Sequence, residues 1–172
     1  CARPLAPFGN QRSICNSCRS ERPYYDRGFA LLLYQEPVST LFHQIKFQNK
    51  LWLLQIFLDH VQRFSHSYEI KNYEMITPIP LDSRRERERG FNQALIIAKM
   101  LKRTDKNNTP PIVPVLKKSK KTLAQSQLRR EERLSNLDGA FTARKRQSIR
   151  GKQILLVDDI FTTGSTINEC AK

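Results

Sequence analysis

The sequence predicts an α/β fold in which a mainly parallel sheet carries helices on both faces. Short apolar runs rich in β-branched residues lie near residues 75–80, 111–116, 138–142 and 153–158, as expected for strands buried on both faces. Helically spaced apolar residues separate the first two of these runs. The last run ends in two acids and a loop of small residues, which is typical of a strand whose carboxyl end borders a ligand crevice.

Length and composition favour a single globular domain with a basic surface. The 172 residues are 39% hydrophobic, enough to fill one core. No apolar run approaches the length of a membrane span and no signal segment is evident, so we expect a cytoplasmic protein. The net charge of +14 and the pI near 10 favour a polyanionic partner. Some proteins are this basic without binding nucleic acid, and that alternative stays open.

The N-terminal segment, residues 1–22, predicts part of a zinc site. Cys15 and Cys18 form a Cys-x-x-Cys knuckle, which in a cytoplasmic protein indicates zinc more often than a disulfide. With Cys1 they supply three ligands, and we expect a fourth cysteine just ahead of Cys1 in the complete protein. Free thiols in a loose arm are the alternative. Cys170, near the other end of the chain, is interpreted as a small core residue.

Residues 27–65 are expected to form a small subdomain beside the sheet, which we call the hood. The apolar run at 29–34 is expected to be a strand, and helical spacing predicts helices over 38–47 and 51–64. Lys46 lies at the end of the first helix. It could face a ligand or could simply be solvated there.

A cluster of arginines follows the predicted strand at 75–80. The proline-stiffened end of that strand leads into residues 84–89, which contain four arginines. One guanidinium group can donate two parallel hydrogen bonds to two phosphate oxygens, so the cluster suits a diphosphate. The favoured contacts are Arg85 and Arg89. The alternative is a solvated helix start held by Arg–Glu pairs. Asn92 and Gln93 then open another predicted helix.

The stretch around residues 154–166 carries the chemistry. Two acids at the tip of a buried strand are costly unless they are paired, solvated or used to bind a ligand. A glycine flanked by hydroxyl side chains can cradle a phosphate, and the helix expected after it favours an anion. The residues concerned are Asp158, Asp159, Thr162, Thr163, Gly164, Ser165 and Thr166.

This stretch resembles the binding signature for phosphoribosyl pyrophosphate in type I phosphoribosyltransferases. The resemblance implies that Asp158 and Asp159 hold the ribose hydroxyls as the catalytic acids and that residues 162–166 hold the 5′-phosphate. Mg²⁺ would accompany the ligand. In those enzymes a long loop closes over the substrate, and residues 117–136 occupy its place here. The ordinary alternative is a strand–loop–helix joint with a polar turn.

The segment at 117–152 is strongly basic, with twelve Lys and Arg against three acids. It predicts a catalytic lid, a track for a nucleic-acid backbone, or both. It contains no aromatic residue before Phe141, so backbone contacts rather than base stacking would have to dominate. The expected nucleic-acid contacts are Lys117, Lys118, Lys120, Lys121, Arg129 and Arg130.

Motifs along most of the chain together resemble the ComF family, whose members are competence-associated proteins with a zinc ribbon ahead of a phosphoribosyltransferase-like domain. The motifs are Pro-Ile-Pro-Leu at 78–81, Arg-Gly-Phe-Asn-Gln at 89–93, Thr122, Gln125, Arg133, Asn136, Ala140-Phe141, and Asp-Asp-Ile-Phe-Thr-Thr-Gly at 158–164. The implied organisation is an incomplete zinc-ribbon segment at 1–22 and a phosphoribosyltransferase-like domain at 23–172, whose last strand is absent from the sequence.

Two functional hypotheses follow. The resemblance implies a competence protein that handles imported single-stranded DNA and binds phosphoribosyl pyrophosphate, with further competence proteins, such as a helicase or DNA-processing factors, as partners. The intact signature also fits an active phosphoribosyltransferase with an unknown acceptor. The sequence contains no recognisable segment for binding a nucleobase, and fold alone does not decide between the two.

Overall fold

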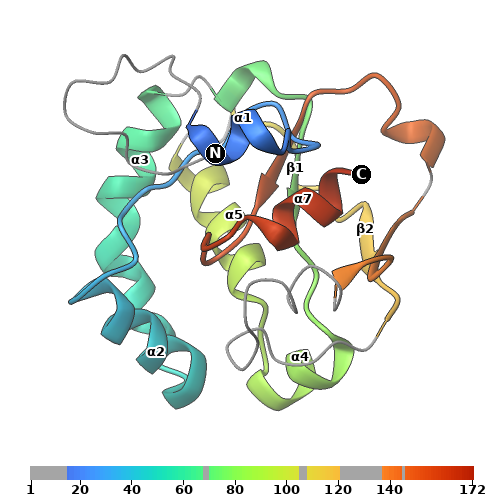
Figure 1. The fold of residues 1–172 in the computed structure, drawn as a ribbon. Helices are drawn as coiled ribbons and strands as arrows, with labels where there is room; N and C mark the ends of the chain where they lie inside the picture. The colour runs from blue at the N-terminus through green and yellow to red at the C-terminus, as the bar shows by residue number, and fades with distance from the viewer. Residues whose placement is uncertain (1–14, 68–69, 105–107, 121–136, 145) are drawn as a thin grey trace.

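The computed structural model describes residues 15–67, 70–104, 108–120, 137–144 and 146–172 (Figure 1). The helices are α1 (Asn16–Ser20), α2 (Val38–Gln48), α3 (Leu58–Ser67), α4 (Ser83–Arg89), α5 (Gln93–Thr104) and α7 (Ser165–Ala171), with 3-10 helices η1 (Leu51–Phe57), η2 (Ile70–Asn72) and η4 (Arg146–Ser148). The strands are β1 (Met75–Pro78), β2 (Leu116–Lys118), β3 (Phe141–Ala143) and β4 (Ile154–Val157). None of the helices in these ranges has both the length and the apolar character that crossing a bilayer requires.

The centre of the fold is the parallel pair of β1 and β4, which confirms the α/β class. The register aligns Met75 with Ile154 and Pro78 with Val157. A parallel bridge joins Ile76 to Ile112 on the other side of β1. Strands predicted near 75–80 and 153–158 are therefore present, although shorter than expected.

The other two predicted strands differ from expectation in place and direction. The stretch at 111–116 makes only the bridge at Ile112, because Pro110, Pro111 and Pro114 have no backbone N–H to donate to a ladder. The strand forms just beyond them, as β2. It pairs antiparallel with β3, which occupies the region predicted at 138–142. The sheet is thus less extensive and less uniformly parallel than the sequence suggested.

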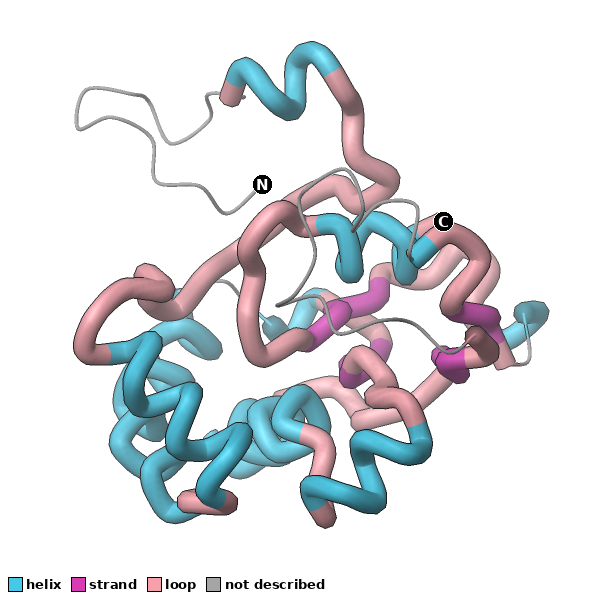
Figure 2. The backbone as a smooth tube through the Cα atoms, turned by 60° about the horizontal axis from the view of Figure 1, so that its bottom comes forward, coloured by secondary structure: helices cyan, strands magenta, loops and turns pink. Residues whose placement is uncertain are grey.

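Helices cover both faces of the parallel pair, as predicted. Ile76, Leu155 and Val157 face a core shared with α5 and the hood. Alternate residues of the same strands, among them Met75, face a second core that includes Ile167 of α7. Figure 2 shows α7 on one side of the strands and α5 with the hood helices on the other. The alternation of a strand therefore assigns one face to each helical layer.

The hood contains helices without the predicted strand. Residues 29–34 form an irregular segment, in which Phe29 makes an edge contact with Phe64 of α3 at 6.0 Å between ring centroids. Leu32 also packs against the core, whereas Leu31, Leu33 and Tyr34 are exposed, so the apolar run does not reflect pairing in a sheet. The predicted helix at 51–64 is also divided, since it starts as η1 and continues as α3. In the 3-10 geometry residues three apart share a face, which buries both Leu54 and Phe57.

Candidate functional site

The acidic pair lies where β4 ends, as the sequence predicted. Asp158 and Asp159 follow Val157, and both side chains are partly buried. The backbone N–H of Asp159 donates to Oδ1 of Asp158 at 2.9 Å, which fixes the first carboxylate against the turn. Both acids are thus held at the carboxyl end of a strand in the centre of the fold, where α/β proteins place their ligands.

Lys46 of the hood reaches this acidic pair. Its Nζ lies 2.8 Å from Oδ2 of Asp159, and the two side chains are only 19% and 15% exposed. Arg89, at the end of α4, also faces Asp159: burial lowers the pKa of Arg89, and the negative charge of Asp159 opposes that effect. The guanidinium lies 5.9 Å from the ring centroid of Phe47, the residue after Lys46. The hood and α4 therefore both bring positive charge to one acid.

Asp158 has different neighbours. Burial raises its pKa from the usual 3.8 to about 7, and the charge of Asp159 acts in the same direction. Lys118 of β2 lies near it: burial and the charge of Arg85 lower the pKa of Lys118, while Asp158 is among the acids that oppose this. Burial, followed by the charge of Asp158, also raises the pKa of the Cys170 thiol. Protonation of Asp158 is thus favoured in the absence of a bound cation.

The loop after the acids is held by its own hydroxyl groups. Oγ of Ser165 lies 2.7 Å from Oγ1 of Thr163, and the backbone N–H of Ser165 donates to the same threonine oxygen at 3.4 Å. The carbonyl of Gly164 accepts from the N–H of Asn168 at 2.8 Å, which starts α7. Ser165 is buried whereas Thr162 is exposed, so the loop is anchored at one end and open at the other.

Gly164 is required by this loop for two reasons. Its φ is +79°, in the left-handed region that side chains disfavour. A Cβ at this position would lie 2.7 Å from Cζ of Phe161 and 3.3 Å from the hydroxyl of Tyr25. Phe161 and Tyr25 also contact each other edge to face, with ring centroids 6.3 Å apart. The glycine is therefore packed beneath an aromatic pair that comes from two distant parts of the chain.

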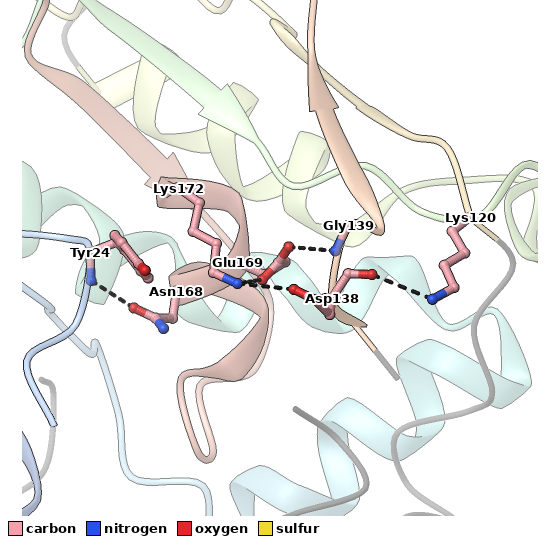
Figure 3. Close-up of polar contacts among 7 residues, drawn as sticks. All are labelled: Tyr24, Lys120, Asp138, Gly139, Asn168, Glu169 and Lys172. Carbon is pink, nitrogen blue, oxygen red and sulfur yellow. Dashed lines mark hydrogen bonds and ion pairs between the residues drawn. The ribbon is translucent and has the colours of Figure 1, made fainter. Parts of the chain in front are cut away.

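Polar contacts from both sides fix α7 behind the loop (Figure 3). The backbone N–H of Tyr24 donates to Oδ1 of Asn168 at 2.7 Å. Oε1 of Glu169 accepts from the N–H of Gly139 at 2.8 Å, and its Oε2 lies 2.8 Å from Nζ of Lys172. These contacts join the helix to the segment that follows α1 and to the turn before β3.

A cavity of about 670 Å³ adjoins the acidic pair. Its walls come from the irregular segment at 24–34, the inner faces of the hood and α5, and the length of β4 up to Asp158 and Asp159. Most of the lining side chains are apolar or aromatic. The carboxylates thus lie at the boundary between a polar, cationic area and an apolar space.

The cysteine knuckle is close to the same loop. The N–H groups of Cys18 and Arg19 both donate to the carbonyl of Cys15 at 3.0 Å, in the turn that starts α1. Both cysteines act electrostatically on the hydroxyl of Tyr25, and together with its burial they raise the pKa of Tyr25. This turn fits half of a tetrahedral zinc site. In the part of the chain that the structure describes, no three potential metal ligands come together, and Cys1 lies outside it.

The expected nucleic-acid contacts separate into different environments. Lys117 and Lys120 are exposed, whereas Lys118 is half-buried because alternate residues of a strand face opposite sides. Its Nζ lies 5.5 Å from the ring centroid of Phe141 on β3, and Asp158 acts on it electrostatically. Lys121, Arg129 and Arg130 lie outside the described residues. Of the favoured diphosphate contacts, Arg89 faces Asp159 and Arg85 lies near Lys118. The Arg–Glu alternative also holds on α4, where Arg84 pairs with Glu88 at 2.8 Å.

Known proteins resemble this chain along almost its whole length. Competence protein F of Haemophilus influenzae is 33% identical over 163 residues, which cover 92% of this chain and 70% of that protein. The chain belongs to the ComF family. Competence protein ComFC of Bacillus subtilis is 29% identical over an alignment that covers all of this chain and 68% of that protein. DNA utilization protein YhgH of Escherichia coli strain K12 is also 29% identical, with 76% of its length covered. No family model and no solved structure matches the chain.

Two residues of the site were not assigned to it from the sequence. The sequence leaves two alternatives for Lys46, a ligand contact or a solvated helix end, and it groups Lys118 with the nucleic-acid contacts. Tertiary packing brings Lys46 of α2 into contact with Asp159 and Lys118 of β2 into electrostatic range of Asp158. The sequence offers one signal for Lys46: it directly follows Ile45, an apolar residue that the structure shows to be fully buried. A side chain at that position starts close to the core.

Substitution of Gly164 tests the packing of the loop. Gly164→Ala and Gly151→Ala both place a side chain at positive φ, which costs about 1 kcal/mol in each case. The Cβ at Gly151 meets nothing within 4 Å, so only Gly164→Ala also collides with Phe161, and we expect it to lose a further ~1–3 kcal/mol. Urea unfolding measures both losses, and Phe161→Leu should recover part of the larger one. Equal losses at the two glycines would contradict the collision.

The stability of the protein should depend on pH through Asp158. Its raised pKa means that the protonated acid stabilises the fold fully below about pH 4, and that this contribution is lost as the pH rises to about 7. Asp158→Asn should therefore be more stable than the wild type at pH 8 by ~1–2 kcal/mol and no more stable at pH 4. Asp138→Asn, which removes an exposed partner of Lys172, is the control and should give no such gain. A gain that is the same at both pH values would argue against this origin.

Proposed function

We propose that this protein binds phosphoribosyl pyrophosphate with Mg²⁺ over Asp158 and Asp159, and that it serves in competence or DNA utilization. The observation that carries the first part is the acidic pair itself, held at the end of β4 between a phosphate-type loop and cations from three separate elements. The names of its relatives support the second part.

The charges suit a ligand with hydroxyls in the middle and phosphates at the ends. Carboxylates accept hydrogen bonds from a ribose diol and also coordinate Mg²⁺, a hard cation that prefers oxygen ligands. Burial and, after it, repulsion from Asp159 raise the pKa of Asp158, and a cation between the two acids would relieve that repulsion. Arg89 and Lys118 are electrostatically coupled to Asp159 and Asp158 respectively, and they could bind the diphosphate.

The loop supplies the other end of the site. Thr162 and Thr166 flank the buried Ser165 and the left-handed Gly164, and successive backbone N–H groups in such a turn form an anion-binding concavity. A 5′-phosphate bound there would place the ribose over the acids, because the loop begins only three residues after Asp159. This arrangement also supports the phosphoribosyltransferase-like fold implied by the signature.

An active phosphoribosyltransferase is the second candidate, and the cavity favours it. Transfer of a ribosyl group needs an acceptor beside the sugar, and the space of about 670 Å³ reaches both carboxylates. Its apolar and aromatic lining suits a flat or weakly polar acceptor better than a highly charged one. In this hypothesis the acids would bind the ribose during transfer.

Two further features belong to the proposal. The net charge of +14 favours handling of single-stranded DNA, with Lys117 and Lys120 on the exposed side of the β2 region. Cys15 and Cys18 would hold one structural zinc together with Cys1 and a cysteine ahead of it. The metal would fix the turn that precedes Tyr24 and Tyr25. Tyr24 contacts Asn168 of α7, and Tyr25 contacts Phe161 at the start of the loop.

Calorimetric titration tests the ligand. Phosphoribosyl pyrophosphate with Mg²⁺ should bind the wild type, and Asp158→Asn combined with Asp159→Asn should weaken binding by about 100-fold, or ~2.7 kcal/mol, because the hydroxyls and the cation lose charged acceptors. Asp59→Asn, on exposed α3, is the control and should bind as the wild type does. Circular dichroism would verify that the double variant is folded. Undiminished affinity in that variant would rule out this site.

Binding of single-stranded DNA is tested by its salt dependence. An oligothymidine should bind with a log affinity that falls linearly with log salt, by about 0.7 per phosphate contacted. Lys117→Glu combined with Lys120→Glu should flatten that slope by roughly 1.4. Arg63→Glu combined with Lys71→Glu changes the charge equally, on α3 and η2, and should have the smaller effect. Negligible affinity of the wild type at low salt would exclude direct DNA handling by this chain.

A further inference from the structure

Lys46 is the hood residue that reaches the acidic pair, and its position is fixed by the core. It lies in the last turn of α2, directly after Ile45, which is fully buried. The ion pair with Asp159 spans 2.8 Å, with both side chains largely shielded from solvent. An ammonium held in this way is part of the site rather than of the surface.

The ammonium has more hydrogen-bonding capacity than this contact uses. A lysine has three N–H donors, and the contact with Asp159 requires one of them. The remaining donors can serve an anion that binds over the same acid. Residues 38–57, which form α2 and η1, contain no acidic residue, so these two helices offer such an anion no repulsion.

Neighbouring charges define where that anion would bind. Arg89 faces the same Asp159 and stacks against Phe47, the neighbour of Lys46. Lys118 is electrostatically coupled to Asp158, and Arg85 to Lys118. A multiply charged group placed over the acids would therefore meet positive charge from α2 and α4 at Asp159, with Lys46 on the side that the hood covers.

We propose that Lys46 is a binding residue for the diphosphate of a phosphorylated pentose, and that it makes the site selective for a sugar that carries this group. The inference rests on the proposed function, because it concerns the same ligand. The ammonium would contact a diphosphate oxygen while it keeps Asp159 oriented toward the ribose. A pentose phosphate without the diphosphate would gain nothing from the first of these contacts.

The test compares two ligands and two lysines. In calorimetry with Mg²⁺, Lys46→Met should weaken the binding of phosphoribosyl pyrophosphate by about 10- to 50-fold. The affinity for ribose 5-phosphate should change by less than about threefold. Lys50→Met removes a lysine that lies just after the same hood helix, where its Nζ contacts Gln44 at 3.2 Å, and should leave both affinities within about twofold.

A second pair of variants separates contact from positioning. Lys46→Met leaves the shielded Asp159 without its partner and could unfold the protein, so the same substitution is also made in Asp159→Asn, where no charge is left unpaired. In the Asp159→Asn background, Lys46→Met should still reduce the ratio of the affinity for phosphoribosyl pyrophosphate to that for ribose 5-phosphate, compared with Asp159→Asn alone.

The outcomes are distinct. An equal loss for both ligands, or an unchanged preference in the Asp159→Asn background, would show that Lys46 only positions the acid and would overturn the proposal. Unchanged affinities in both Lys46→Met variants would remove Lys46 from the site altogether, while the proposed function would stand. A wild type that binds neither ligand would overturn the proposed function, and this inference with it.

Discussion

The parallel pairing of β1 with β4 is the constraint on which the rest of the structure depends. Because β1 is buried along its whole length and β4 at alternate residues, the backbone groups between them must be paired within the sheet, and each face must be covered by a helix. α5 and the hood cover one face and α7 covers the other. The acids come directly after the second strand, so their position follows from the register of this pair.

The site is organised by charge around two acids with unequal surroundings. Both are partly buried, but Asp159 is paired with Lys46, whereas Asp158 has a raised pKa. The charge of Asp159 is thus balanced by the protein itself, whereas burial and the charge of Asp159 favour the protonated form of Asp158. The two carboxylates are therefore chemically distinct, although they are neighbours in the sequence.

Much of the site was predictable from the sequence because its signature is local. The acids, the left-handed glycine and the hydroxyl groups all lie within nine residues, and each is required by backbone geometry or by chemistry that the sequence displays directly. Lys46 and Lys118 could not be assigned in this way, since they reach the acids from separate elements. The strand predicted at 29–34 was wrong, because an apolar run indicates burial but not whether a strand or a helix lies opposite. The predicted strand at 111–116 was reduced to a bridge by prolines whose effect could have been anticipated.

The hydrogen bond from Tyr24 to Asn168 joins residues that are 144 positions apart in the chain. Closing so long a loop costs conformational entropy before any contact repays it, so such contacts form late in folding. The neighbouring elements α3, β1 and α5 can assemble from shorter-range contacts before that. The phosphate loop would therefore acquire its final geometry only after the two ends of the chain have met. A folding chain would then have its core before it has its binding site, and ligand could stabilise only the finished molecule.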